Sequence, residues 1–139
     1  MMQLEGVDEL LKTFKQFGPL VAKRAGVTGV RKAATYVRKN LKADAPKVSG
    51  TLRKSIGYKK LRQRGRNDSA VAYIVGLRKR YYYRTLEFGN KRVSFPTHPF
   101  AGRSFQRSSS TAVRIMIKGM KDAVYFEAGK SYRRSLQRR

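Results

Sequence analysis

The sequence contains no cysteine, so it can form neither a disulfide framework nor a thiolate metal site. Its single histidine, His98, lies between two prolines; it has no cysteine with which to form a catalytic dyad, and no motif specifies a serine partner. Acidic residues are scarce, with 8 Asp and Glu in 139 residues, and they show no acid pair and no metal-ligand spacing. We therefore expect no cofactor and no metal, and we predict that the protein is not an enzyme.

Long apolar runs are also missing. No stretch approaches the roughly 18 apolar residues of a membrane span, so no membrane partner is expected. Residues 1–6 lack the basic segment and apolar run of a secretory signal peptide, which predicts synthesis and use in a cytoplasmic setting. A phosphate-binding glycine loop is absent too, because Gly26 and Gly29 lack the lysine and the preceding strand of that motif.

Positive charge, in contrast, is present in large excess. The chain has 33 Lys and Arg, which gives a formal net charge of +25. Such charge opposes folding through self-repulsion, and no requirement of a fold explains it. We expect a compensating partner, either nucleic acid or an acidic protein surface, with a solvated cationic surface as the alternative.

Apolar periodicity predicts helices before and after the middle of the chain. Residues 7–17 carry an apolar stripe at helical spacing, with Asp8 and Glu9 in the first turn, where the helix dipole favours acids. Gly18-Pro19 is predicted to end this helix and to begin the next, because proline is favoured at a first helical position.

The second helix is predicted over residues 20–45. Gly26 and Gly29 weaken its middle by about 1 kcal/mol each relative to alanine, which favours a break or kink there. Pro46 sets its end, since the residue before a proline avoids the helical conformation. A last helix is predicted from Gly102 to about Ala128.

Residues 52–77 are predicted to form a β-hairpin. Thr51 either caps a short turn, or Leu52 opens the first strand directly and continues to Leu61. Residues 63–68 carry turn chemistry and basic side chains. The second strand, residues 69–77, is apolar on both faces and is therefore expected to be central in its sheet.

Aromatic residues concentrate in the next stretch, residues 81–105, which holds seven of the fifteen Tyr and Phe. Each such ring can cover roughly 150–250 Å², so this stretch is predicted to be the hub on which the other elements pack. Residues 82–88 fit a short helix or a strand equally well, and residues 93–95 fit a short strand.

These elements predict an α+β fold, with N-terminal helices, a small antiparallel β-sheet, an aromatic loop and a long C-terminal helix packed on the sheet. Residues 1–129 are expected to form a single domain. Residues 130–139 hold five basic residues and no acid, and are expected to be a basic tail that is ordered only by contacts.

The order of several motifs resembles a known family. Pro46 is followed by Gly50-Thr51-Leu52-Arg53-Lys54-Ser55-Ile56, then by Tyr83 with Glu87-Phe88-Gly89, and then by Pro99-Phe100 before a last helix. This succession is similar to the neck and tail-completion family of long-tailed bacteriophages, often described as tail components. Asn90 stands where that family more often has threonine, and the charge of +25 is high for such a protein.

The resemblance implies a structural virion protein made in the host cytoplasm. Such a protein would form a ring of six or twelve copies at the phage head–tail junction. It would join the connector or head-closure protein to the tail-terminator or tail-tube protein, and would line or surround the channel for viral double-stranded DNA.

Two sets of residues are candidate sites. The first consists of cations that could contact DNA phosphates without reading sequence, or an acidic protein surface: Arg53, Lys54, Lys59, Lys60, Arg62, Arg64, Arg66, Arg78, Lys79, Arg80, Arg133, Arg134, Arg138 and Arg139. The second consists of candidates for a subunit interface or a fold hub: Tyr83, Leu86, Glu87, Phe88, Pro99 and Phe100. Glu87 either pairs with an arginine of a neighbouring subunit or forms an ion pair within its own chain.

Two alternatives to the virion role stay open at this level. The composition fits a sequence-nonspecific nucleic-acid-binding module, ribosomal or nucleoid-like, equally well, although such a module does not account for the ordered motifs. A small nuclease would have to rely on His98 with acidic partners, and it ranks last.

Overall fold

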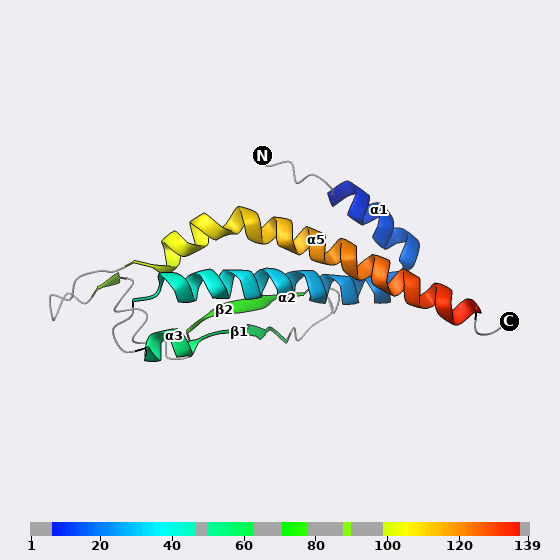
Figure 1. Ribbon diagram of the computed structural model, residues 1–139. Helices are drawn as coiled ribbons and strands as arrows, with labels where there is room; N and C mark the ends of the chain where they lie inside the picture. Colours follow the sequence, from blue (N-terminus) through cyan, green and yellow to red (C-terminus); the bar gives the residue numbers. More distant parts are fainter. Residues whose placement is uncertain (1–6, 47–49, 63–70, 78–87, 90–98, 137–139) are drawn as a thin grey trace. The chain divides into compact units, whose positions relative to one another are not determined.

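The computed structural model describes residues 7–46, 50–62, 71–77, 88–89 and 99–136 of the chain (Figure 1). In chain order the elements are α1 (Val7–Phe17), α2 (Pro19–Asp44), α3 (Thr51–Ser55), β1 (Ile56–Lys60), β2 (Tyr73–Leu77) and α5 (Ala101–Leu136). The strands form a two-stranded antiparallel sheet. Helices before a small antiparallel sheet and a long helix after it confirm the predicted α+β class.

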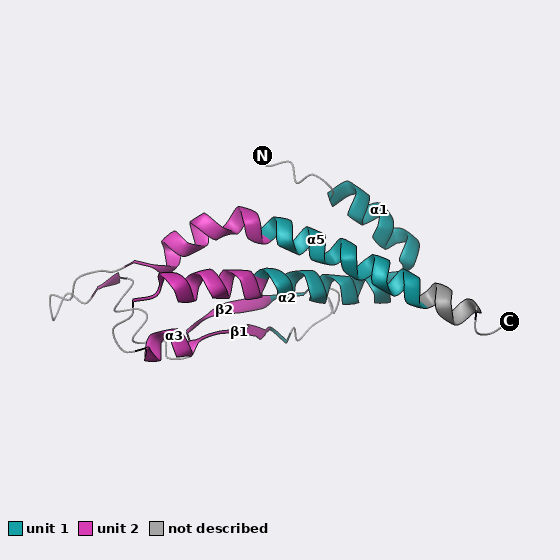
Figure 2. Cartoon of the chain, in the orientation of Figure 1, with its two compact units in different colours: residues 1–33, 61–72, 113–139 teal, residues 34–60, 73–112 magenta. Residues whose placement is uncertain are grey.

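Contacts divide the chain into two compact units (Figure 2). Unit 1 comprises residues 1–33, 61–72 and 113–139, and unit 2 comprises residues 34–60 and 73–112. Helices α2 and α5 are each divided between the two units, so that one part of each helix belongs to unit 1 and the other part to unit 2. Unit 2 contains the sheet, and unit 1 contains α1.

Helix α1 has the predicted bounds, and the predicted boundary at Gly18-Pro19 is confirmed. Gly18 adopts a φ of 81°, a left-handed conformation that ends a helix and that only glycine adopts without strain. Pro19 then begins α2, where its missing N–H would have had no partner in any case. Leu10 is the buried residue of α1.

Helix α2 runs from Pro19 to Asp44 without interruption, so of the break or kink expected at Gly26 and Gly29, the break is wrong. Gly29 is buried in unit 1 against α5. A Cβ on Gly29 would clash with Cγ of Met120 and would lie 2.6 Å from the carbonyl oxygen of Met116. This glycine therefore permits a close approach of two helices, and its conformational freedom is not used.

Helix α5 begins at Ala101 and continues to Leu136, beyond the expected end near Ala128. Gly129 does not end it, because a helix interior tolerates a single glycine at a cost of about 1 kcal/mol. Arg133 and Arg134 fall within its last residues. Most of the segment expected to be a tail is thus helical.

The predicted hairpin is present, with Ile56 paired to Leu77 and Lys60 paired to Tyr73. Its first strand does not open at residue 52, because the short helix α3 precedes it, with Gly50 at the N-cap position in place of Thr51. Strand β2 begins at Tyr73, so residues 71–72 of the expected strand 69–77 do not belong to it, and residues 69–70 lie outside the described residues. In the described sheet β2 pairs with β1, and its expected central position stays a prediction.

The core of unit 2 joins α2, α3, β1 and the start of α5. Its buried members are Leu41, Ala45, Leu52, Ile56 and Phe100, with Val75, Leu77 and Ala101 packed against them. Phe100 is thus the aromatic residue of the stretch 81–105 that reaches the described core. The candidate elements at 82–87 and 93–95 lie outside the described residues.

Candidate functional site

The β-hairpin carries the first group of candidate residues. Along β1 the side chains change from the buried Ile56, 1% exposed, to the exposed Lys59 and Lys60. Lys54 in α3 and Arg62 after β1 are also exposed. None of these four cations has an ion-pair partner among the described residues.

The hairpin cations lack described partners because nearly all described carboxylates are paired elsewhere. Four of the five carboxylates within the described ranges are already paired with cations on the helices, in the pairs Glu9–Lys121, Asp44–Arg107, Asp122–Lys32 and Glu127 with both Arg24 and Lys130. Only Asp8 is left. The described acids therefore cannot neutralise the hairpin cations, and an external anion would meet them unpaired.

Arg53 differs from its basic neighbours because its guanidinium serves the fold. Its Nε and Nη2 atoms donate to the carbonyl oxygen of Ala45 at 3.2 and 3.1 Å, and Nη2 also donates to Ala43 at 3.2 Å. These carbonyls lie at the C-terminal end of α2, where backbone oxygens lack helical partners. Arg53 thus ties α3 to the end of α2.

Tyr58, considered as a stacking group for bases, packs within unit 2. Its ring centroid lies 6.0 Å from that of Tyr73, and the Arg38 guanidinium lies 5.7 Å above it. The Nε atom of Arg38 also donates to the carbonyl oxygen of Ile56 at 3.3 Å. These contacts hold β1 against α2.

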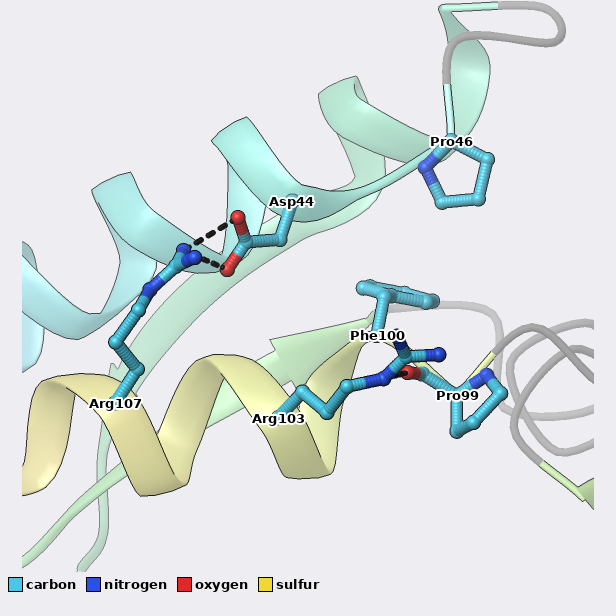
Figure 3. Close-up of a pocket in the computed structure, with 6 residues that line it drawn as sticks. All are labelled: Asp44, Pro46, Pro99, Phe100, Arg103 and Arg107. Carbon is cyan, nitrogen blue, oxygen red and sulfur yellow. Dashed lines mark hydrogen bonds and ion pairs between the residues drawn. The ribbon is translucent and has the colours of Figure 1, made fainter.

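A pocket of about 320 Å³ lies in unit 2, at the start of α5 (Figure 3). Its described lining residues are Asp44, Pro46, Pro99, Phe100, Arg103 and Arg107. Figure 3 shows Arg107 extended toward Asp44 and Arg103 beside Pro99. Two guanidinium groups, a single carboxylate and an apolar wall thus surround one hollow.

Hydrogen bonds fix both arginines of this pocket but leave donors over. Nη2 of Arg107 donates to both carboxylate oxygens of Asp44 at 2.5 Å. Nε of Arg103 donates to the carbonyl oxygen of Pro99 at 2.8 Å. The terminal nitrogens of Arg103 have no partner among the described residues, so the pocket retains donors and a net positive charge for an anion.

The ion pairs shift three pKa values. The hydrogen bond from Arg107 holds the pKa of Asp44 below its ordinary value of 3.8. In unit 1, Nζ of Lys121 lies 2.6 Å from Oε2 of Glu9. The hydrogen bond and the charge of Lys121 lower the pKa of Glu9 below 4.5, and the same hydrogen bond raises the pKa of Lys121 above 10.5.

Acidification should therefore destabilise the protein through its carboxylates. A lowered pKa means that Asp44 contributes stability above its unfolded pKa, near 4, and loses it as the pH falls through the folded value. Asp44→Asn should flatten the dependence of the urea midpoint on pH between about 5 and 2. Asp8→Asn removes a carboxylate that has no ion pair with any described residue, and it serves as the control. Equal flattening in both variants would contradict the assignment.

The other candidate residues are placed as follows. Arg133 and Arg134 lie in the last turns of α5, Phe88 is exposed, Pro99 lines the pocket, and Phe100 lies in the core. The remaining candidates lie outside the described residues: Arg64, Arg66, Arg78, Lys79, Arg80, Arg138, Arg139, Tyr83, Leu86 and Glu87.

Sequence reasoning did not find the pocket. Among its polar members, Asp44 lies far in sequence from Arg103 and Arg107. The hydrogen bond from Arg107 to Asp44 joins residues 63 positions apart. The spacing of Arg103 and Arg107 by four residues in a predicted helix was the available signal, since it places both on one face. Which residues face them is decided by tertiary packing.

Within the described ranges, no three His, Cys, Asp or Glu side chains gather in a way that could hold a metal ion. In the same ranges, no helix is both long and apolar enough to cross a membrane.

The fold and its surfaces define a small, helix-rich α+β protein whose exposed cations outnumber its available acids. Residues 8–89, more than half of the chain, match the sequence model of the family described as "Bacteriophage HK97-gp10, putative tail-component". The chain belongs to this family of phage tail components. No curated protein and no solved structure matches it.

The match confirms the resemblance drawn from the motifs. It includes the stretch from Pro46 to Ile56 and the stretch from Tyr83 to Gly89. It ends before Pro99-Phe100, so the pocket at the start of α5 lies partly beyond the matched residues.

Proposed function

We propose that this protein is a structural subunit of a ring at the head–tail junction of a long-tailed phage. The observation that carries the proposal is the family match over residues 8–89. A ring of six or twelve copies would sit between the connector or head-closure protein and the tail-terminator or tail-tube protein of the virion. Identical subunits in such a ring meet through heterologous contacts, in which two different surfaces face each other.

The charge of the chain supports a place beside DNA. Six copies at +25 would concentrate so much positive charge that a polyanion or an acidic neighbour is needed to balance it. The hairpin cations have no described carboxylate to pair with. We propose that they face the DNA channel and contact phosphates without reading sequence. In this role the protein performs no catalysis.

The mass of the purified protein tests the ring directly. We expect particles of six or twelve subunits in mass photometry and rings in negative-stain images, in the presence of a short duplex DNA at low salt. A chain that stays monomeric while it binds duplex DNA would contradict the ring. That result would favour a nonspecific nucleic-acid-binding module, which the unpaired hairpin cations also fit.

The hairpin variant tests the DNA contact. We expect the combined replacement of Lys54, Lys59, Lys60 and Arg62 by glutamine to weaken binding to duplex DNA at least about tenfold. The slope of log affinity against log salt should fall by about three to four, because each phosphate contact contributes roughly 0.9 to it. Fluorescence anisotropy over a salt series measures both quantities.

The matched control removes four other exposed cations that have no described ion-pair partner, by replacing Lys12, Lys15, Lys39 and Lys118 with glutamine. This variant has the same net charge as the hairpin variant. If both variants lose the same affinity and the same salt slope, the hairpin is not the contact surface. The affinity for duplex DNA then depends only on the net charge of the protein.

A further inference from the structure

Two aromatic side chains that follow each other on α5, Tyr125 and Phe126, are exposed to solvent. They are 68% and 63% exposed, and both belong to unit 1, in the teal part of α5 (Figure 2). The Nζ atom of Lys130 lies 4.2 Å from the centre of the Phe126 ring, and this contact leaves most of the ring accessible. Burying the two rings on binding would be favourable. Tyr125 and Phe126 are called the aromatic pair below.

Unit 1 also contains an apolar groove of about 510 Å³ between α1, α2 and α5. This volume falls within the roughly 300–1,000 Å³ of ligand pockets, so the groove has room for an aromatic side chain. Leu20 of its lining is 73% exposed and therefore accessible to a partner. Among its described lining residues the charged one is Lys23. Most of the lining is apolar: Phe14, Pro19, Leu20, Val30, Val71 and Met120.

The aromatic pair lies on the side of α5 that is turned away from the groove of its own chain. Met120 of α5 lines that groove, and neither ring of the aromatic pair does. Because successive residues of an α-helix are about 100° apart, Tyr125 lies about 140° round the helix from Met120, and Phe126 lies about 120° round it in the other direction. One subunit can therefore offer its groove to one neighbour and its aromatic pair to another.

We propose that the apolar groove of one copy binds the aromatic pair of a second copy. The rings of Tyr125 and Phe126 pack on the leucine, valine and methionine side chains that line the groove, and both rings leave water. Groove and aromatic pair are different surfaces of one chain, so the contact is heterologous and can repeat around a ring. The inference rests on the proposed ring and names a contact that joins its subunits.

The size of the contact favours a second copy within a ring over a separate partner protein. Two rings of roughly 150–250 Å² each, about two-thirds exposed, would bury on the order of 500 Å² together with the groove surface that they cover. Stable interfaces bury at least about 1,200 Å². A single contact of this size does not hold two molecules together. A closed ring, in contrast, engages every subunit on two sides at once, and each contact then supports the others.

The charge pattern of α5 also favours this place for a second copy. Two chains that each carry +25 repel each other. Residues 101–120 of α5 contain four cations and no acid, whereas residues 121–130, which hold the aromatic pair, contain two lysines with Asp122 and Glu127. A second copy can therefore approach the balanced part of the helix at a lower electrostatic cost. Duplex DNA fits the groove less well, because the apolar lining offers no donors to phosphates.

The sequence contains no tryptophan, so an introduced tryptophan reports on the contact through its emission. In Phe126→Trp the emission should shift to shorter wavelength as the protein self-associates, because the indole leaves water when it enters the groove. Tyr125→Trp is measured beside it, so that the result does not depend on the fit of one larger ring. Phe105→Trp, at an exposed position of the same helix, is the matched control and should show no shift. Analytical ultracentrifugation of the same samples follows the association.

Blocking the groove should remove the shift. Ala22 lines the groove, and Ala22→Phe would fill it with a ring of its own chain. Added to Phe126→Trp, this substitution should abolish the shift and raise the concentration at the midpoint of self-association at least about tenfold. Ala43→Phe, at an exposed alanine of α2 outside the groove, is the control and should leave the midpoint within about threefold. Tyr125→Ser combined with Phe126→Ser removes the other half of the contact and should also raise the midpoint at least about tenfold. Thermal denaturation shows whether each variant is folded.

These measurements separate the inference from the proposed ring. Rings that assemble without an emission shift, or with a shift that survives Ala22→Phe or appears equally in Phe105→Trp, would leave the ring standing and overturn this contact. A shift on addition of duplex DNA to a chain that stays monomeric would assign the aromatic pair to DNA and overturn it as well. A shift in open chains or dimers would support the contact and reject the closed ring. A wild-type chain that does not associate at any concentration, with or without duplex DNA, would reject both.

Discussion

Replacing Phe100 by alanine should lower the free energy of unfolding by about 3–5 kcal/mol. Its side chain is 6% exposed and belongs to the core that joins α2, α3, β1 and the start of α5. Removing the ring loses its transfer free energy and leaves a cavity, because Leu41 and Ile56 are held by their own helix and strand and can refill the space only partly. Urea denaturation followed by circular dichroism measures the change.

The control for this prediction is Phe105→Ala on the same helix. Phe105 is 62% exposed, so its removal should change the free energy of unfolding by no more than about 0.5 kcal/mol. Similar losses in the two variants would show that Phe100 has no special place in the core. A large loss for Phe100 alone would assign it a role in the core of unit 2.

Gly29→Ala should lower the free energy of unfolding by about 2–3 kcal/mol, although alanine is ordinarily the better helix former. The added Cβ would clash with Cγ of Met120 and lie 2.6 Å from the carbonyl oxygen of Met116. A side chain can move aside, but a backbone oxygen within a helix cannot. Helices α2 and α5 of unit 1 would have to separate at this point, with loss of the packing around them.

Gly26→Ala, in the same helix, is the matched control with the opposite expected sign. The nearest atom to its added Cβ is Cγ2 of Val71 at 3.7 Å, an ordinary contact. This substitution should raise the free energy of unfolding by up to about 1 kcal/mol through helix propensity. Chemical denaturation measures the free energy of unfolding of both variants. A Gly29→Ala variant more stable than the wild type would disprove the close approach of α2 and α5.

The helices were the most predictable part of the fold, and their physical signals are local. The stripe of α1, the Gly18-Pro19 boundary and the stop before Pro46 depend on neighbours within a few residues, so the sequence carries them directly. The prediction of a break in α2 was wrong because the free-energy cost of a glycine within a helix is small compared with the stabilisation from the helix packing that Gly29 permits. The predicted end of α5 near Ala128 was wrong because Gly129, a residue type common just after a helix end, is here tolerated within the helix.

The candidate site also has a part that the sequence predicts and a part that it does not. The basic character of the hairpin follows from composition and period alone, so Lys54, Lys59, Lys60 and Arg62 could be named in advance. Arg53 belongs to the same run, but the carbonyls that its guanidinium binds lie at the end of another helix. The pocket could not be foreseen, because an arginine in a helix carries no sign of the aspartate that it meets 63 residues away.

By itself, the sequence determined the α+β class, the family, the excess of positive charge and the absence of cysteine. These properties depend on composition, on period and on motifs within short windows. Tertiary structure alone decided that Gly29 is a contact between helices, that Phe100 is core, and that two arginines of α5 share a pocket with Asp44. Such facts depend on residues that are distant in the chain and near in space, and no local pattern records which distant residues will meet.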